Sequence, residues 1–426
     1  MEHAGHTVSP DLARHIRAGD TVVWGQADAQ PLTLIRLLVA QRLRIGRLRL
    51  FLGIGQGLDD ILLPAHRDAF DLLAYCGSGS NARLARAGAL DILPAPYSDL
   101  PGLMLGGPLR ADVVMLRVSP PDAQGRHSLG MAREYLVPAL ARARVVLAET
   151  HPSVPWTFGG PYLQAGDFDL LIDGDDARAA AEAAGNETAE AIGRHVADLV
   201  EDGATLQTGI GAVPDAVLAA LRHHRDLGMH SGSLGDGLVT LAECGALTNA
   251  RKGRDAGVTV GGVLIGGERL RRHAHYNPRL TLRSTEYTHD AQVLASLARL
   301  TAINSAIEVD LSGQANSEVA GGAYVGAVGG ILDFLNGAHA SRGGVPIVAL
   351  PSMARGRSRI VARLSGPATV PRACPCVIVT EHGAADLRGL SLSRRIDRLL
   401  GIADPTQREA LERELAGMPA QGWTSA

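Results

Sequence analysis

Short apolar segments alternate with helix-like segments along nearly the whole chain. Residues 21–25 have the pattern of a buried strand, and residues 34–44 that of the helix after it. Further buried strands are expected at 48–54, 113–118 and 145–148. Because parallel strands need helical crossovers, this order is typical of an α/β protein with a mostly parallel sheet. Such folds bind ligands in the loops that follow their strands.

The chain of 426 residues is too long for one ordinary hydrophobic core, so we expect two domains. Aliphatic runs give way to Asp and Ala near residues 173–186, which predicts an N-terminal α/β domain at 1–180 and a C-terminal one at 187–426. After a helix expected at 187–202, the alternation resumes with strands. These strands are expected at 204–207, 258–265, 302–311, 346–350 and 377–380. We expect the two halves to face each other across a cleft.

The charge balance excludes several classes of protein. With 41 basic and 44 acidic residues, the net charge of −3 gives no basic surface for nucleic acid or an anionic membrane. No uncharged apolar run reaches the roughly 18 residues of a membrane span, and the first residues do not resemble a secretory signal. The four cysteines lack the spacing of a zinc site. We therefore expect a cytoplasmic protein with reduced thiols and no metal.

Glycine is over-represented, with 51 residues where average usage gives about 30, and the surplus gathers in loops. The sharpest loop connects an expected strand to a helix that begins near Pro214. It consists of Gly209, Ile210, Gly211, Ala212 and Val213. Backbone N–H groups at a helix N-terminus bind anions without any lysine. The spacing leaves a phosphate-binding loop and a plain tight turn equally open.

Two more clusters indicate chemistry. Residues 230–237 hold three glycines between an expected strand and an expected helix, which favours a functional loop over a linker. Residues 284–290 place two carboxylates, a phenol and an imidazole before a helix expected at 291–300. Asp290 alone is expected to be an N-cap, and His289 is equally open to a site role or a solvated position.

The arginines of the second half offer one more pattern. Arg355, Arg357 and Arg359 alternate, so an extended segment would point them to one face. Lys252 is the only lysine, so arginine is expected to hold any phosphate. A solvated basic face is the alternative interpretation.

Taken together, these segments resemble the acetyl-CoA hydrolase/transferase family, which includes 4-hydroxybutyrate, succinyl-CoA:acetate and itaconate CoA-transferases. The resemblance runs in order through residues 118–130, 209–215, 236–249, 287–290, 303–314, 328–334 and 379–389. It implies two tandem Rossmann-like domains of the NagB/RpiA type, with acyl-CoA bound between them. It also implies that residues 209–213 contact CoA and that Gly326 and Gly330 lie along the CoA molecule. Gly330 is further expected to supply an oxyanion-hole N–H, and Arg355 to lie near CoA.

Two positions depart from the pattern of this family. Relatives with the well-studied transferase mechanism carry a nucleophilic glutamate two residues after the position of His230, and here that position is Gly232. Glycine has no nucleophile, so a covalent mechanism cannot use this residue. The oxyanion-hole asparagine of those relatives is replaced by His289, whose imidazole can still donate a hydrogen bond.

Three mechanisms stay open at this point. Another carboxylate attacks the thioester; the nearby candidates are Glu286, Asp290 and Glu318. Alternatively, the acceptor carboxylate attacks directly, with His289 and Gly330 holding the oxyanion and Gly232 giving the acceptor room. As a third outcome, the protein is a hydrolase with His289 or His230 as the base, or an acyl-CoA binder without transfer chemistry.

The resemblance as a whole predicts a CoA-transferase that moves CoA between a short-chain acyl-CoA and a small carboxylate. A dicarboxylate acceptor such as itaconate or succinate is included, because arginines are abundant. No tightly bound cofactor is expected, since CoA is a substrate. The family also favours a homodimer or larger homo-oligomer, and neither nucleic acid nor membrane is an expected partner.

Overall fold

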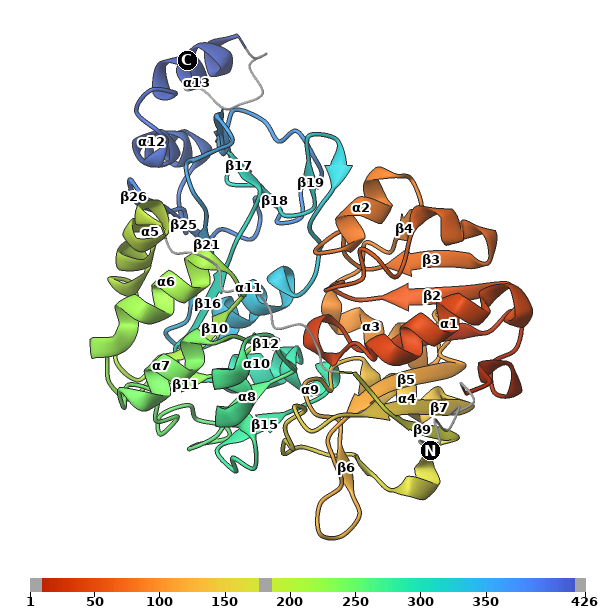
Figure 1. The fold of residues 1–426 in the computed structure, drawn as a ribbon. Coiled ribbons are helices and arrows are strands. Elements are labelled where there is room, and N and C mark those ends of the chain that lie inside the picture. Colours follow the sequence, from red (N-terminus) through yellow and green to blue (C-terminus); the bar gives the residue numbers. More distant parts are fainter. Residues whose placement is uncertain (1–9, 176–185, 418–426) are drawn as a thin grey trace.

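The computed structural model describes residues 10–175 and 186–417. The fold is built around two large open β-sheets (Figure 1). The first has the order β4-β3-β2-β1-β5-β7-β9, with all neighbours parallel. Its strands are β1 (Thr21–Trp24), β2 (Leu48–Leu52), β3 (Phe70–Ala74), β4 (Leu90–Ile92), β5 (Val113–Val118), β7 (Val145–Thr150) and β9 (Leu170–Asp173). The second has the order β11-β10-β16-β21-β25-β26, and β26 runs antiparallel to β25. Its strands are β10 (Thr205–Thr208), β11 (Gly228–Met229), β16 (Leu300–Asn304), β21 (Val345–Ala349), β25 (Val377–Thr380) and β26 (Gly383–Asp386).

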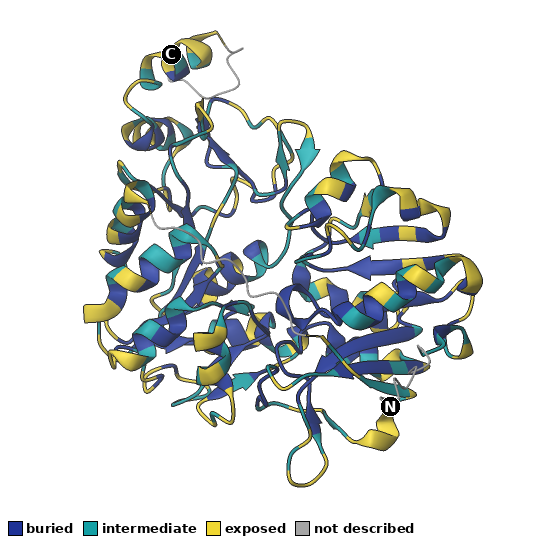
Figure 2. Cartoon of the chain, viewed as in Figure 1, coloured by how far each residue is buried: buried dark blue, intermediate teal, exposed yellow. Residues whose placement is uncertain are grey.

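Several inner strands of both sheets are buried on both faces. Every residue of β1, β5, β10 and β25 is buried, and successive side chains of a strand point to opposite faces, so both faces are covered. Figure 2 shows this burial in both sheets and where the two halves meet. The helices of the first half are α1 (Leu32–Ile45), α2 (Asn81–Arg86), α3 (Leu100–Leu105) and α4 (Leu136–Arg142). Those of the second half are α5 (Glu187–Ala197), α6 (Ala212–Ala220), α7 (Gly237–Glu243), α8 (Glu268–Ala274), α9 (Thr285–Thr288), α10 (Ala291–Ser296), α11 (Ile331–Ala340), α12 (Leu392–Ile402) and α13 (Arg408–Ala416).

The predicted α/β class with two mostly parallel sheets is confirmed. The domain limits at 1–180 and 187–426 stay a prediction, and the strands of each sheet fall within one of these ranges. Among the described residues, no helix combines the length and the apolar character that crossing a bilayer requires.

Two predicted strands are wrong, because each is divided between different sheets. Residues 258–265 form β13 (Thr259–Gly261) and β14 (Val263–Leu264), which pair with β15 (Leu280–Leu282) and β12 (Ser233–Leu234), respectively. The break falls at Gly262, whose N–H donates to the Gly232 carbonyl at 3.0 Å. Residues 302–311 likewise divide into the end of β16 and β17 (Glu308–Asp310), which belongs to a separate three-stranded sheet. Apolar runs alone do not show which partner a strand finds.

Backbone hydrogen bonds join the two halves of the chain. The bonded pairs, donor first, are Gly77–Gly326 at 2.8 Å, Tyr97–Gly329 at 2.9 Å, Arg133–Gly262 at 3.0 Å and Leu264–Met131 at 2.8 Å. A Cβ on Gly77 would lie 2.3 Å from the Tyr324 carbonyl oxygen, so only glycine permits this approach. One hydrophobic core also includes residues from both sheets, such as Val114 and Leu206. The halves therefore meet as a continuous packed structure.

A buried ion pair holds the start of α1 against the first sheet. Glu149 on β7 accepts a hydrogen bond from the Arg117 guanidinium on β5 at 2.9 Å, and both side chains are almost completely buried. Its other oxygen accepts the backbone N–H groups of Thr33 and Leu34, at 2.9 and 3.0 Å. A carboxylate in this place satisfies N–H groups that the first helical turn leaves without partners.

We expect Glu149→Ala to lower the free energy of unfolding by about 3–5 kcal/mol, because it removes the carboxylate that neutralises a buried guanidinium and accepts the first N–H groups of α1. Urea unfolding followed by tryptophan fluorescence measures the change. Arg36→Ala is the control, since it breaks the exposed Arg36–Asp175 pair, and such pairs contribute only about 0–1 kcal/mol. Similar losses in the two variants would contradict this account.

Candidate active site

A cavity of about 180 Å³ lies where the carboxyl ends of the two sheets meet. From the first sheet, Gln26, Ile54 and Tyr75 line it just after β1, β2 and β3. From the second, Thr208 and Asn304 line it at the last residues of β10 and β16. Parallel strands direct their carboxyl ends to one edge of a sheet, which is where α/β proteins bind ligands. The predicted cleft between the halves is thus a small cavity that is partly open to solvent.

Five of the residues singled out from the sequence line this cavity. They are Gly209, Ile210, Gly232, His289 and Gly330. They come from four separate segments, and the fold brings them together because β10 and β11 are neighbours while α9 ends and α11 begins at the cavity. Their predicted roles stay predictions, which the geometry below makes specific.

His289 is fully buried between two aromatic rings. Its ring centroid lies 5.0 Å from that of Tyr97 and 4.7 Å from that of Phe334. Burial lowers its pKa to about 3, so the imidazole is neutral near pH 7. Thr288 Oγ1 lies 2.9 Å from Nδ1 and 3.3 Å from the Ser284 carbonyl oxygen, and its one hydrogen can be donated to either. When the hydroxyl donates to Nδ1, the ring hydrogen is on Nε2. His289 can then act as a neutral hydrogen-bond donor.

Gly330 lies opposite Nε2 of His289, at the N-cap of α11. A Cβ on Gly330 would be 2.7 Å from that nitrogen, so any larger residue would displace the imidazole. Gly330 and Ile331, where α11 begins, both line the cavity, and the helix dipole favours negative charge at this end. The helix is held in place by Asp333, which accepts hydrogen bonds from the Ser98 hydroxyl at 2.7 Å and backbone N–H at 3.2 Å.

Gly232 lies beside the same imidazole. A Cβ there would be 3.0 Å from His289 Cε1 and 3.1 Å from Nε2. A side chain at this position would therefore extend into the space in front of His289, and glycine leaves that space open.

Glu134, a residue that sequence reasoning missed, also lines the cavity. It is completely buried, and burial raises its pKa to about 8. Its Oε1 accepts hydrogen bonds from Gln26 Nε2 at 2.7 Å and the Tyr97 hydroxyl at 2.9 Å, whereas Oε2 has no partner. Its backbone is strained, with φ at +28°. The available signal was a charged residue inside the apolar segment 129–136.

The loop that resembles a CoA-binding element has the geometry of a helix N-terminus. Gly211 takes φ +111° as the N-cap of α6, which Ala212 and Val213 begin. Ile210 is 40% exposed at the mouth of the cavity. Of the two interpretations open from the sequence, this arrangement favours an anion-binding loop, since the first N–H groups of a helix lack intrahelical partners.

Other residues singled out from the sequence lie outside the cavity. His230 is buried behind it, where its Nε2 donates to the Thr288 carbonyl at 3.0 Å. Gly326 contributes its carbonyl to the Gly77 N–H. Glu286 is exposed, and Asp290 is the expected N-cap, accepting the Val293 N–H of α10. Glu318 accepts hydrogen bonds from the hydroxyls of Tyr324 and Thr369.

The extended arrangement considered for three arginines is not observed. A hairpin of β22 (Met353–Ala354) and β23 (Arg357–Ser358) interrupts it. Arg355 occupies the turn with φ +50°, followed by Gly356 with φ +73°, so its side chain does not alternate with those of Arg357 and Arg359. Arg355 is exposed, and its proposed place near CoA stays a prediction.

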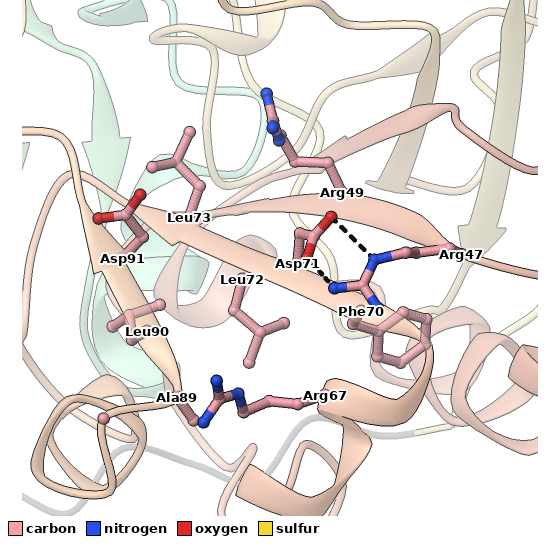
Figure 3. A pocket seen from close by; sticks show the side chains of 11 residues that line it. Arg47, Arg49, Arg67, Phe70, Asp71, Leu72, Leu73, Ala89, Leu90 and Asp91 are labelled. Atoms are coloured by element: carbon pink, nitrogen blue, oxygen red, sulfur yellow. Dashed lines mark hydrogen bonds and ion pairs between the residues drawn. The ribbon is translucent and has the colours of Figure 1, made fainter.

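A separate hollow of about 580 Å³ lies at the opposite edge of the first sheet (Figure 3). It lies at the amino ends of β2, β3 and β4. The residues that line it there include Arg47, Arg67 and Ala89, which precede these three strands in the sequence. Arg47 forms an ion pair there with Asp71. The hollow shares no lining residue with the cavity at His289.

Known proteins share this fold and sequence. Residues 266–415 match the acetyl-CoA hydrolase/transferase C-terminal domain. The 4-hydroxybutyrate coenzyme A transferase of Clostridium kluyveri is 33% identical, over 92% of this chain and 93% of the relative. The chain belongs to the acetyl-CoA hydrolase/transferase family. Within this family, succinyl-CoA:acetate/propanoyl-CoA:succinate CoA transferase of Fasciola hepatica is 35% identical, over 79% of this chain and 72% of the relative.

A solved structure extends the similarity over the whole architecture. RipA from Yersinia pestis is 30% identical, with a TM-score of 0.89 over 94% of each chain. The relatives that align with most of this chain are named CoA-transferases. This confirms the prediction that the protein is a CoA-transferase.

The two buried histidines predict how stability depends on pH. The pKa of His230 is lowered to about 4 and that of His289 to about 3, both chiefly by burial. In the unfolded chain a histidine has a pKa of about 6.5. Below that value the unfolded state binds more protons than the folded state, so acid should destabilise the protein.

We expect His230→Gln to reduce this acid sensitivity, because the amide can donate to the Thr288 carbonyl but does not titrate. The loss of unfolding free energy between pH 6.5 and 5 should shrink by about 2 kcal/mol. Urea unfolding at the two pH values measures it. An unchanged difference between the two pH values would show that His230 does not titrate as described.

Proposed function

We propose that this enzyme transfers CoA from a short-chain acyl-CoA to a monocarboxylate acceptor, with the thioester held in the cavity beside His289. The observation that carries the proposal is the convergence on one cavity of a helix N-terminus, a neutral buried imidazole and a buried carboxyl group. The helix N-terminus and the imidazole can stabilise the oxyanion that forms when a carboxylate attacks a thioester carbonyl.

The size and walls of the cavity support a short acyl group. Its volume is only about 180 Å³. Much of the wall is apolar, formed by Ile54, Ile210, Val263, Ile265, Ile331 and Phe334. An acyl chain of a few carbons can fill such a space, while the longer CoA part extends past Ile210 toward the start of α6.

The charges around the cavity support a monocarboxylate over the itaconate- or succinate-like acceptor considered from the sequence. Among the described residues that line it there is no arginine or lysine. A second carboxylate would therefore be desolvated without a cationic partner, which is costly. The only carboxylate of a monocarboxylate acceptor becomes part of the neutral thioester product, so the product needs no cationic partner.

A panel assay tests this function. We expect acetyl-, propionyl- and butyryl-CoA to exchange with acetate, propionate and butyrate, and kcat/KM with succinate or itaconate to be at least about tenfold lower, which corresponds to about 1.4 kcal/mol. Chromatography of the CoA esters measures the exchange. Thiol release without an acceptor would indicate a hydrolase instead, and CoA binding without either reaction would indicate a non-catalytic protein.

Removing the imidazole tests the oxyanion site. We expect His289→Ala to lower kcat for transfer by about 10²–10³-fold, the usual effect of losing one oxyanion donor, with little change in acyl-CoA affinity. His289→Asn is the matched variant, because its amide can donate a hydrogen bond, and it should recover part of the loss. Retention of kcat within about threefold in His289→Ala would exclude this role.

A further inference from the structure

Glu134 is a buried carboxyl group at the cavity, and no role in stabilising the fold explains its position there. Glu134 connects a segment of the first half to α4, and its backbone carbonyl accepts the Thr285 N–H from the second half at 3.3 Å. It therefore lies at the junction of the two halves. A completely buried carboxyl with one oxygen unpartnered is costly to maintain, as is a non-glycine residue at φ +28°.

Hydrogen bonds determine the orientation of the Glu134 side chain. Gln26 Oε1 accepts from the Ile54 N–H at 3.0 Å and from the Tyr75 hydroxyl at 2.6 Å. The amide nitrogen of Gln26 must therefore point the other way, and it donates to both Glu134 Oε1 and the Tyr97 oxygen. The Tyr97 hydroxyl in turn donates to Oε1. Two donors fix Oε1, so Oε2 is the oxygen available for chemistry.

Glu134 lies close to the position where the family pattern would place a nucleophile. The link is Gly262, where a Cβ would be 2.8 Å from the Gly232 carbonyl oxygen and 3.1 Å from Glu134 Cγ. On its other side, Gly232 borders the His289 imidazole. The space that Gly232 leaves open thus has the oxyanion donors at one wall and a carboxyl group at another.

We propose that Glu134 is the catalytic carboxylate that attacks the acyl-CoA thioester in this chain. This inference rests on the proposed function and adds the residue that performs its first step. Because desolvation makes its oxygen more basic than that of an exposed carboxylate, Glu134 is also a stronger nucleophile once ionised. Gln26 and Tyr97 are positioning residues, which hold the carboxylate through Oε1.

The chemical steps balance without water or another cofactor. The ionised Oε2 forms a bond to the thioester carbonyl carbon, the C–S bond breaks, and its electron pair leaves on the CoA sulfur, which gives a mixed anhydride on Glu134. The CoA thiolate then attacks the Glu134 carbonyl carbon and releases the first carboxylate. The acceptor carboxylate reverses both steps, taking CoA and regenerating the Glu134 carboxylate.

The first experiment compares Glu134→Gln with Glu268→Gln, which changes an exposed carboxylate on α8 that forms an ion pair with Arg272. We expect Glu134→Gln to lose transfer by on the order of 10³-fold while binding CoA alone with unchanged affinity by calorimetry. Glu268→Gln should transfer at the wild-type rate. Transfer by Glu134→Gln within about threefold of wild type would overturn the inference while leaving the proposed function intact. A wild-type protein without transfer would refute the proposed function itself.

A second experiment needs no variant and so does not depend on the folding of Glu134→Gln. Wild-type enzyme is incubated with butyryl-CoA, treated with borohydride, and digested for peptide mass spectrometry. Hydride reduces a glutamyl thioester to an alcohol, so we expect the altered residue to be Glu134 and the exchange kinetics to be ping-pong. Reduction at another carboxylate, or sequential kinetics with no altered residue, would overturn the inference.

Discussion

The site depends on backbone hydrogen bonds between the two halves of the chain. Tyr97 donates to Gly329 and Arg133 to Gly262, so each bond places a residue of the first half directly beside a segment of the second half. Backbone groups buried in such a junction must be paired, which leaves little freedom in how the halves meet. Tyr97, Glu134, Gly232 and Gly330 are thereby brought around one cavity, although they come from distant segments of the sequence.

Burial shifts the pKa values of Glu134 and His289, which both lie at this junction, in opposite directions. Desolvation disfavours the charged form of any group, so the pKa of His289 falls to about 3 while that of Glu134 rises to about 8. Near pH 7 the imidazole is therefore a neutral donor, and the carboxyl is close to the pH at which it ionises. One physical cause prepares the two groups for different tasks, without any cation among the described residues of the wall.

Much of the fold could be predicted from the sequence because its signals are local. The strand at Val113–Val118 and the helix that follows β1 are evident from apolar runs and periodicity. The single strand predicted at 258–265 is wrong because the backbone is interrupted at Gly262, whose N–H donates to the Gly232 carbonyl. This contact joins segments that are distant in the sequence. The extended alternation considered for Arg355, Arg357 and Arg359 is absent for a related reason, since a two-residue turn interrupts it.

The sequence by itself determined the α/β class, the family, and several residues of the cavity wall: Gly209, Ile210, His289 and Gly330. It also has Gly232, without a side chain, where the family resemblance predicts a nucleophile. Only the tertiary structure decided which carboxylate lies nearby, placing Glu134 at the cavity and Glu286 in solvent. The reason is physical: composition and spacing describe neighbours along the chain, whereas desolvation and reach depend on neighbours in space.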